Sequence, residues 1–158
     1  MSYEEKEIAM ARAWEKLFIY GSLLGGQHDG MRELLKDCSL SLGDARMQAR
    51  LYSLGDYPAA VLSSDSSNGV VGELRSIDPL SRRALFRALD DYEGFRGENG
   101  PRGEFRRERV LVRDAADVVH RPWAYVYEAD PSTLVMVPDG DWLAWLDGAD
   151  LTRAKRES

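Results

Sequence analysis

The chain has 158 residues, of which 44% are hydrophobic and 30% charged, as expected for one soluble globular domain. Its formal net charge of −6 argues against non-specific binding to a nucleic-acid backbone, so we expect no nucleic-acid partner. The single cysteine excludes an internal disulfide, and with only two histidines we expect no metal site. No apolar run approaches the ~20 residues that span a bilayer, and residues 1–15 lack the apolar core of a signal peptide. We therefore expect no membrane partner and a cytoplasmic location.

The first part of the chain predicts a helix, a strand and a second helix. Ser2 and Glu5 have the spacing of a capping box, which favours a helix over residues 3–15. Residues 17–20 form a continuous apolar run after Lys16, and a buried strand is predicted over residues 16–20. After a break at two glycines, a helix is expected over residues 28–36.

The middle of the chain predicts strands joined by turns. Apolar and polar residues alternate over 45–54, which is typical of a strand, and a turn at 55–58 leads to a short return strand at 59–62. A tight turn at 65–69 precedes a further strand over 69–77.

A further, amphipathic helix is expected after that strand. Asp78 is suited to cap it, Pro79 to occupy its first turn, and Gly94 to end it. Its predicted apolar face consists of Leu80, Ala84, Leu85, Ala88, Leu89 and Tyr92. Residues 95–104 are rich in glycine and charge, and are expected to form a loop.

Two further strands are predicted over 104–113 and 123–129, and a short helix or turn over 141–146. About six strands joined by short turns, with a few helices, predict an α+β fold whose core is a curved or barrel-like antiparallel sheet. The predicted organisation is an N-terminal helical extension (1–15), one domain (16–148) and a charged tail (149–158).

Two segments about seventy residues apart suggest a functional site. The first is the loop formed by Tyr20, Gly21, Ser22 and Leu23. Its glycine-hinged backbone offers N–H groups suited to a carboxylate or an oxyanion. The second is the acidic end of the helix expected after Asp78, where Asp90, Asp91 and Glu93 meet the negative end of the helix dipole. A carboxylate held there tends to have a raised pKa, which suits a general base near neutral pH.

Other residues have competing interpretations. Taken alone, Glu93 is more consistent with a solvated acid at a helix end than with a functional residue, and Asp90 is expected to be a structural or surface acid. Ser22 is not expected to be a nucleophile, because the pattern Gly-x-Ser-x-Gly is absent. Tyr125 and Tyr127 share one face of a strand, which lines either the core or a pocket.

The charged and remaining aromatic residues favour structural roles. Acids are interleaved with the arginines at 96, 102, 106, 107 and 109, which predicts a solvated strand and loop. Arg107 stays a candidate contact for a substrate carboxylate. His28 and His120 are expected to be surface or loop residues, Cys38 a core residue, and Trp142 and Trp145 hydrophobic anchors.

An ordered set of short motifs resembles the gamma-glutamylcyclotransferase-like family. The motifs are Phe18-Ile19-Tyr20-Gly21-Ser22-Leu23, Leu51-Tyr52-Ser53-Leu54-Gly55-Asp56-Tyr57-Pro58-Ala59, Val71-Gly72-Glu73-Leu74, Leu89-Asp90-Asp91-Tyr92-Glu93-Gly94, Ala124-Tyr125-Val126-Tyr127 and Gly140-Asp141-Trp142. Each is weak alone, but together they run in the family's order over residues 16–146.

The resemblance implies a small mixed, mainly antiparallel, barrel-like sheet flanked by helices. It also implies a pocket beside Tyr20–Leu23 and Glu93 as catalytic acid and base. It implies a cofactor-free enzyme that converts a γ-glutamyl amide or amine into 5-oxoproline and the free amine. Expected substrate-binding residues are Tyr20, Gly21, Ser22, Leu23, Arg107 and Tyr127. The expected partner is a small γ-glutamyl molecule, and a homodimer is one possible assembly.

The sequence departs from the family pattern in two places. Phe105 stands where a tyrosine is expected, which removes one hydroxyl contact to a substrate. The loop continues as Leu24-Gly25-Gly26, without the tryptophan of the glutathione-degrading branch, so glutathione is not the expected substrate. Two alternatives stay open: a non-catalytic module that binds a small molecule, and an amide hydrolase in which Glu93 activates water.

Overall fold

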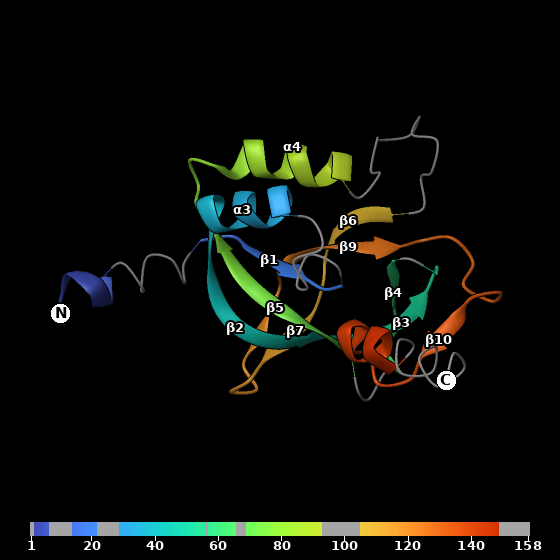
Figure 1. Cartoon of the computed structure of the whole chain (residues 1–158). Coiled ribbons are helices and arrows are strands. Elements are labelled where there is room, and N and C mark those ends of the chain that lie inside the picture. Colours follow the sequence, from blue (N-terminus) through green and yellow to red (C-terminus); the bar gives the residue numbers. More distant parts are fainter. Residues whose placement is uncertain are drawn as a thin grey trace.

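A computed structural model describes residues 2–6, 14–21, 29–55, 57–65, 69–92 and 105–148. These residues form two β-sheets with helices packed around them, which confirms the predicted α+β class. Figure 1 shows a strongly curled large sheet, with helices α3 and α4 side by side over one part of it and a small sheet on the other side. The curl gives the sheet the barrel-like shape expected from the sequence.

The large sheet has seven strands in the order β6-β9-β1-β5-β2-β7-β8. Their bounds are β1 Lys16–Ile19, β2 Ser39–Met47, β5 Val70–Ile77, β6 Phe105–Arg109, β7 Val112–Asp114, β8 Val119–His120 and β9 Trp123–Tyr127. The β1–β9 pair is parallel and the other pairs are antiparallel. The register of β2 against β5 shifts between Ser41 and Gly43. Because such a bulge bends its strand and increases the local twist, it helps the sheet to curl.

The small sheet has three antiparallel strands in the order β10-β3-β4. They are β3 Ala49–Ser53, β4 Pro58–Leu62 and β10 Val135–Val137. The prediction of one strand over 45–54 is therefore wrong. The chain bends at Gln48, whose N–H bonds to the carbonyl of Leu111, and crosses from one sheet to the other. The alternation of apolar residues continues through the bend, so the pattern did not reveal it.

The predicted strand over 104–113 is also two strands. It divides into β6 and β7 around Val110, whose N–H bonds to the carbonyl of Pro122. The two-residue strand β8 brings His120 to Asp114, with Nε2 of His120 2.8 Å from Oδ2 of Asp114. The expectation that His120 is a surface or loop residue is wrong, because it lies in this strand with its side chain 18% exposed.

The first helix begins with the capping box that the sequence predicted. Ser2 and Glu5 exchange the two hydrogen bonds of a capping box, at 3.1 and 3.3 Å, at the start of a helix over 3–6. Trp14 and Glu15 are not helical, so the helix ends before the predicted limit. Helix α3 covers Asp29–Cys38, and a further helix covers 142–148.

Helix α4, Arg82–Tyr92, begins later than the cap at Asp78 suggests. The carboxylate of Asp78 accepts the N–H of Leu80 and closes a turn before the helix. Leu80 is 97% exposed and Ala84 is also exposed, so their predicted inward orientation is wrong. The buried face consists of Leu85, Phe86 and Leu89.

Strand β1 lies between two hydrophobic layers. Phe18 packs between the two sheets, whereas Leu17 and Ile19 pack under α3 and α4. Burial on both faces explains why the β1 sequence is a continuous apolar run rather than an alternating one. Cys38 lies in the layer under the helices and is 6% exposed, as predicted for a small core residue.

Glu15 joins the start of β1 to α4 and β6. Its carboxylate accepts hydrogen bonds from Arg82 and from Arg109, the latter at 3.2 Å, and its carbonyl accepts the N–H of Ile77. The guanidinium of Arg82 lies over Phe86, at 4.9 Å from the ring centroid. These contacts hold the beginning of β1 against the α4 face of the large sheet.

The pKa of Glu15 is lowered, chiefly by the hydrogen bond from Arg82. A carboxylate with a lowered pKa stabilises the fold above its unfolded pKa, and this contribution disappears as the pH falls. Glu15→Gln is therefore expected to reduce the free energy of unfolding at pH 7 by up to about 1 kcal/mol. In urea unfolding, the difference between variant and wild type should shrink as the pH falls below the unfolded pKa of about 4.3, and should vanish once the pH is below the lowered pKa of the folded state. A difference that stays constant from pH 7 to pH 3 would contradict this role.

Candidate functional site

Gly21 forms a tight turn directly after β1. Its φ is +82°, and a Cβ added to it would lie 2.4 Å from Cγ of Pro58, the first residue of β4. Both the left-handed backbone and the contact with Pro58 exclude a side chain. The turn that the sequence singled out is therefore a close approach between β1 and the small sheet.

Tyr20 joins the two sheets through its hydroxyl group. The hydroxyl donates to the carbonyl of Tyr125 at 2.5 Å and accepts the N–H of Ala60 at 3.3 Å. Tyr125 belongs to β9 and Ala60 to β4. These bonds hold the residue before Gly21 at the junction of β1, β4 and β9.

Asp90 is held in the last turn of α4 by two side chains from the sheet. Its Oδ1 accepts the hydroxyl proton of Tyr125 at 2.5 Å and lies 3.4 Å from Nη1 of Arg107. Tyr125 and Arg107 are direct partners in the β6–β9 register. Asp90 is thus a structural acid, as one interpretation of the sequence had it, and it ties the end of α4 to the sheet.

Arg107 lies between aromatic rings rather than in solvent. Its guanidinium carbon is 4.1 Å from the ring centroid of Phe86 and 5.6 Å from that of Trp123. Its Nη1 is buried and makes no hydrogen bond within the part of the chain that the structure describes. The prediction that the arginines here form a solvated strand holds for Arg106, whose side chain is 58% exposed, but not for Arg107, at 24%.

Tyr127 lies on the same face of β9 as Tyr125, next to a separate aromatic group. Its ring centroid is 5.5 Å from that of Phe105, in an edge-to-face arrangement, and the side chain is 8% exposed. Side chains on one face of β9 thus belong to two different hydrophobic clusters. Tyr125 packs under α4, and Tyr127 packs against residues of β4 and β6.

The structure brings some predicted site residues together and leaves others undescribed. Tyr20, Gly21, Arg107 and Tyr127 all lie on or beside strands β1, β6 and β9. Ser22, Leu23 and Glu93 fall outside the described residues. Their roles in substrate binding and catalysis stay predictions.

Tyr125 and Pro58 are the positioning residues that the sequence did not identify. Tyr125 accepts from Tyr20 through its carbonyl and donates to Asp90 through its hydroxyl. It therefore connects the residue before the Gly21 turn with the helix end three residues before Glu93. No local signal marks such a bridge, since Tyr20 and Asp90 are separated by seventy positions in the sequence.

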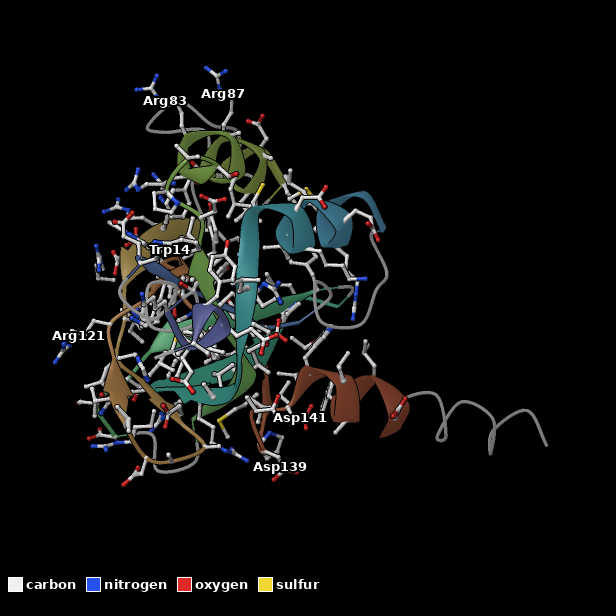
Figure 2. The ribbon with its side chains drawn as sticks, turned by 90° about the vertical axis from the view of Figure 1, so that its left-hand side faces the viewer. Trp14, Arg83, Arg87, Arg121, Asp139 and Asp141 are labelled. Carbon is white, nitrogen blue, oxygen red and sulfur yellow. The ribbon has the colours of Figure 1, made fainter. Side chains whose placement is uncertain are left out.

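A cavity of about 1060 Å³ lies elsewhere, beside β2, β5, β7 and the helix over 142–148. Six carboxylates and two arginines line it, and none of the predicted site residues does: the charged residues are Asp44, Arg46, Glu73, Arg113, Asp114, Asp117, Asp141 and Asp147. Figure 2 shows Asp141 beside the start of that helix, and Arg83 and Arg87 projecting outward from α4.

Within the described residues, no three metal-ligating side chains are grouped, and no helix is long and apolar enough to cross a membrane.

Comparison with known proteins relates both the motifs and the fold to one protein family. Residues 17–144 match the family model "Gamma-glutamyl cyclotransferase, AIG2-like". The chain is 32% identical over 130 residues to the gamma-glutamylcyclotransferase family protein YtfP of Escherichia coli K12. The aligned region covers 81% of this chain and 96% of YtfP. The solution structure of E. coli YtfP matches with a TM-score of 0.51, at 30% identity and over the same shares of the two chains.

More distant solved structures share the fold alone. An AIG2-like protein from Mus musculus matches with a TM-score of 0.59 at 18% identity, over 78% of this chain and 86% of its own. Allophanate hydrolase from Kluyveromyces lactis matches with a TM-score of 0.59 at 14% identity, over 86% of this chain but 21% of its own. The family model, the relative in E. coli and the fold together show that this chain belongs to the gamma-glutamyl cyclotransferase, AIG2-like family.

Proposed function

We propose that this protein is a cofactor-independent γ-glutamylcyclotransferase-type enzyme. Its substrate is a γ-glutamyl amide or amine, and its products are 5-oxoproline and the released amine. The substrate's own α-amine attacks the γ-carbonyl carbon, the new C–N bond closes a five-membered lactam, and the bond to the leaving nitrogen breaks. Because nucleophile and electrophile belong to one molecule, correct positioning supplies much of the rate enhancement.

In this proposal Glu93 moves the proton and the Gly21 turn holds the substrate. Glu93 accepts a proton from the attacking α-amine and returns one to the leaving nitrogen, so the reaction consumes no external acid or base. Backbone N–H groups of residues 21–23 hold the substrate carboxylate or the developing oxyanion.

The observation that supports this proposal most strongly is the bridge made by Tyr125. It links Tyr20, which precedes the turn, to Asp90, which lies three residues before Glu93. Tyr20, which precedes the glycine turn, and Asp90, at the acidic helix end, therefore both contact the same residue of β9. Family membership supports the reaction class but not the identity of the amine.

A panel of γ-glutamyl amino acids and γ-glutamyl amines tests the proposal. Incubation with purified protein should release 5-oxoproline from at least one member, identified by mass spectrometry. Release of glutamate instead would favour the amide hydrolase. Binding of panel members without any product would favour the non-catalytic module.

Sedimentation of the same preparation would show whether the protein forms the homodimer that we also propose.

A further inference from the structure

We propose that Tyr20 is a positioning residue of the proposed site, whose hydroxyl group fixes the Gly21 turn and does not itself contact the substrate. The inference rests on the proposed function. It assigns to Tyr20 a role other than the substrate contact that the family resemblance implies.

Tyr20 and Gly21 hold the end of β1 against the same strand at two points. The hydroxyl of Tyr20 accepts the N–H of Ala60 at 3.3 Å, and Gly21 packs against the ring of Pro58. Pro58 and Ala60 are two positions apart in β4, so their side chains lie on the same face of that strand. Two consecutive residues of the turn region therefore contact neighbouring positions on one face of β4.

The hydroxyl of Tyr20 also connects this point to β9. The ladder between β1 and β9 pairs Leu17 with Trp123, near the beginning of both strands. Directly after β1, the hydroxyl of Tyr20 donates to the carbonyl of Tyr125 at 2.5 Å. The ring itself is stacked on Phe18, with 6.3 Å between the centroids. Packing of the ring and both hydrogen bonds thus fix the direction of this side chain.

The hydrogen-bonding capacity of the hydroxyl argues against a substrate contact. A tyrosine hydroxyl carries a single proton, and in Tyr20 that proton is donated to the carbonyl of Tyr125. Both backbone partners belong to buried residues, since Tyr125 is 5% and Ala60 0% exposed. Donation to a substrate carboxylate or oxyanion would leave a buried carbonyl without its partner, which costs free energy. Tyr20 therefore acts on the substrate through the turn that it holds.

The first test replaces Tyr20 by phenylalanine, which keeps the ring and removes the hydroxyl. We expect kcat/KM for 5-oxoproline formation to fall by about tenfold or more, because a small displacement of a binding group has effects on this scale. Tyr52→Phe is the matched control. Tyr52 pairs with Ala59, so it lies on the other face of the small sheet from Pro58 and Ala60. Its kcat/KM should stay within about twofold of wild type.

A double-mutant cycle separates action through the turn from a direct contact with the substrate. Pro58→Ala removes the ring on which Gly21 packs, and so disturbs the turn independently of Tyr20. If Tyr20 acts through the turn, the double variant should have a kcat/KM within about threefold of the weaker single variant. Losses that multiply, to about 10²-fold for two tenfold effects, would overturn the inference.

Amide hydrogen exchange and the amide resonance of Gly21 give a readout that needs no turnover. Tyr20→Phe should speed exchange at the N–H of Ala60 by about fivefold or more and shift the Gly21 resonance, and Tyr52→Phe should do neither. Wild-type exchange and resonance in Tyr20→Phe would show that the hydroxyl does not hold the turn. Equal kcat/KM in wild type and Tyr20→Phe would refute the inference alone, whereas no 5-oxoproline from wild type would refute the proposed function.

Discussion

Replacing Glu93 by glutamine is expected to lower kcat/KM for 5-oxoproline formation by about 10²- to 10⁴-fold, the range typical of a lost general acid or base. Glutamine keeps the size and polarity of the side chain but does not accept the proton of the attacking amine. The thermal unfolding midpoint should stay at the wild-type value. The measurement is the initial rate with the best substrate of the panel, alongside a thermal melt.

Asp91→Asn provides the matched control for this variant. Asp91 is an exposed acid in the last turn of α4, two positions before Glu93 in the sequence. Its replacement removes the same charge from the same region and should leave kcat/KM within about threefold of wild type. Similar losses in both variants would indicate a general effect of charge at the helix end and remove the assigned role of Glu93.

Replacing Gly72 by alanine is expected to destabilise the protein by about 3 kcal/mol, or to prevent folding. An added Cβ would lie 2.2 Å from the carbonyl oxygen of Ile19 and 2.4 Å from Cζ of Phe18. Ile19 and Phe18 belong to β1, which pairs with β5 in this register. The clash therefore pushes β5 away from β1, the strand that leads into the Gly21 turn. Chemical denaturation gives the free energy directly.

Gly30→Ala is the control for the steric argument. Gly30 lies in α3, and an added Cβ would meet nothing within 4 Å. Because alanine has a higher helix propensity, this variant should be up to about 1 kcal/mol more stable than wild type. Equal destabilisation by both substitutions would show that the close contact at Gly72 is not what limits stability.

Elements specified by local chemistry were predictable from the sequence. The capping box at Ser2, the apolar run of β1 and the inward face of α4 around Leu85 and Leu89 each depend on neighbouring residues alone. A short helix or turn was expected over 141–146, where the structure has a helix over 142–148. Asp141 caps it through the N–H of Ala144, and Trp142 is buried as a hydrophobic anchor.

Features that depend on distant contacts were not predictable. The break at Gln48 follows from a bond to Leu111, sixty-three positions away in the chain, while the hydrophobic pattern continues unchanged. Strands β8 and β10 have two and three residues, too few for a pattern to indicate them. Leu80 was assigned to the core by periodicity, but the chain turns at Asp78 before the helix begins.

The candidate site was predictable as a set of segments rather than as a geometry. The glycine at 21 and the acidic helix end were visible as local signals, and the family motifs gave them roles. The hydrogen bonds through Tyr125 and the contact of Gly21 with Pro58 join residues that are far apart in the sequence, so the sequence alone did not predict them. Arg107 looked like a surface arginine because its neighbours are charged, yet Phe86 and Trp123 cover it.

A crystal structure of the protein soaked with 5-oxoproline tests the central claim most directly. The account predicts the product carboxylate or lactam oxygen within hydrogen-bond distance of the backbone N–H groups of residues 21–23. It also predicts the carboxyl group of Glu93 within reach of the lactam nitrogen. Product bound only in the acid-lined cavity beside Asp141, or Glu93 directed into solvent away from the turn, would contradict it.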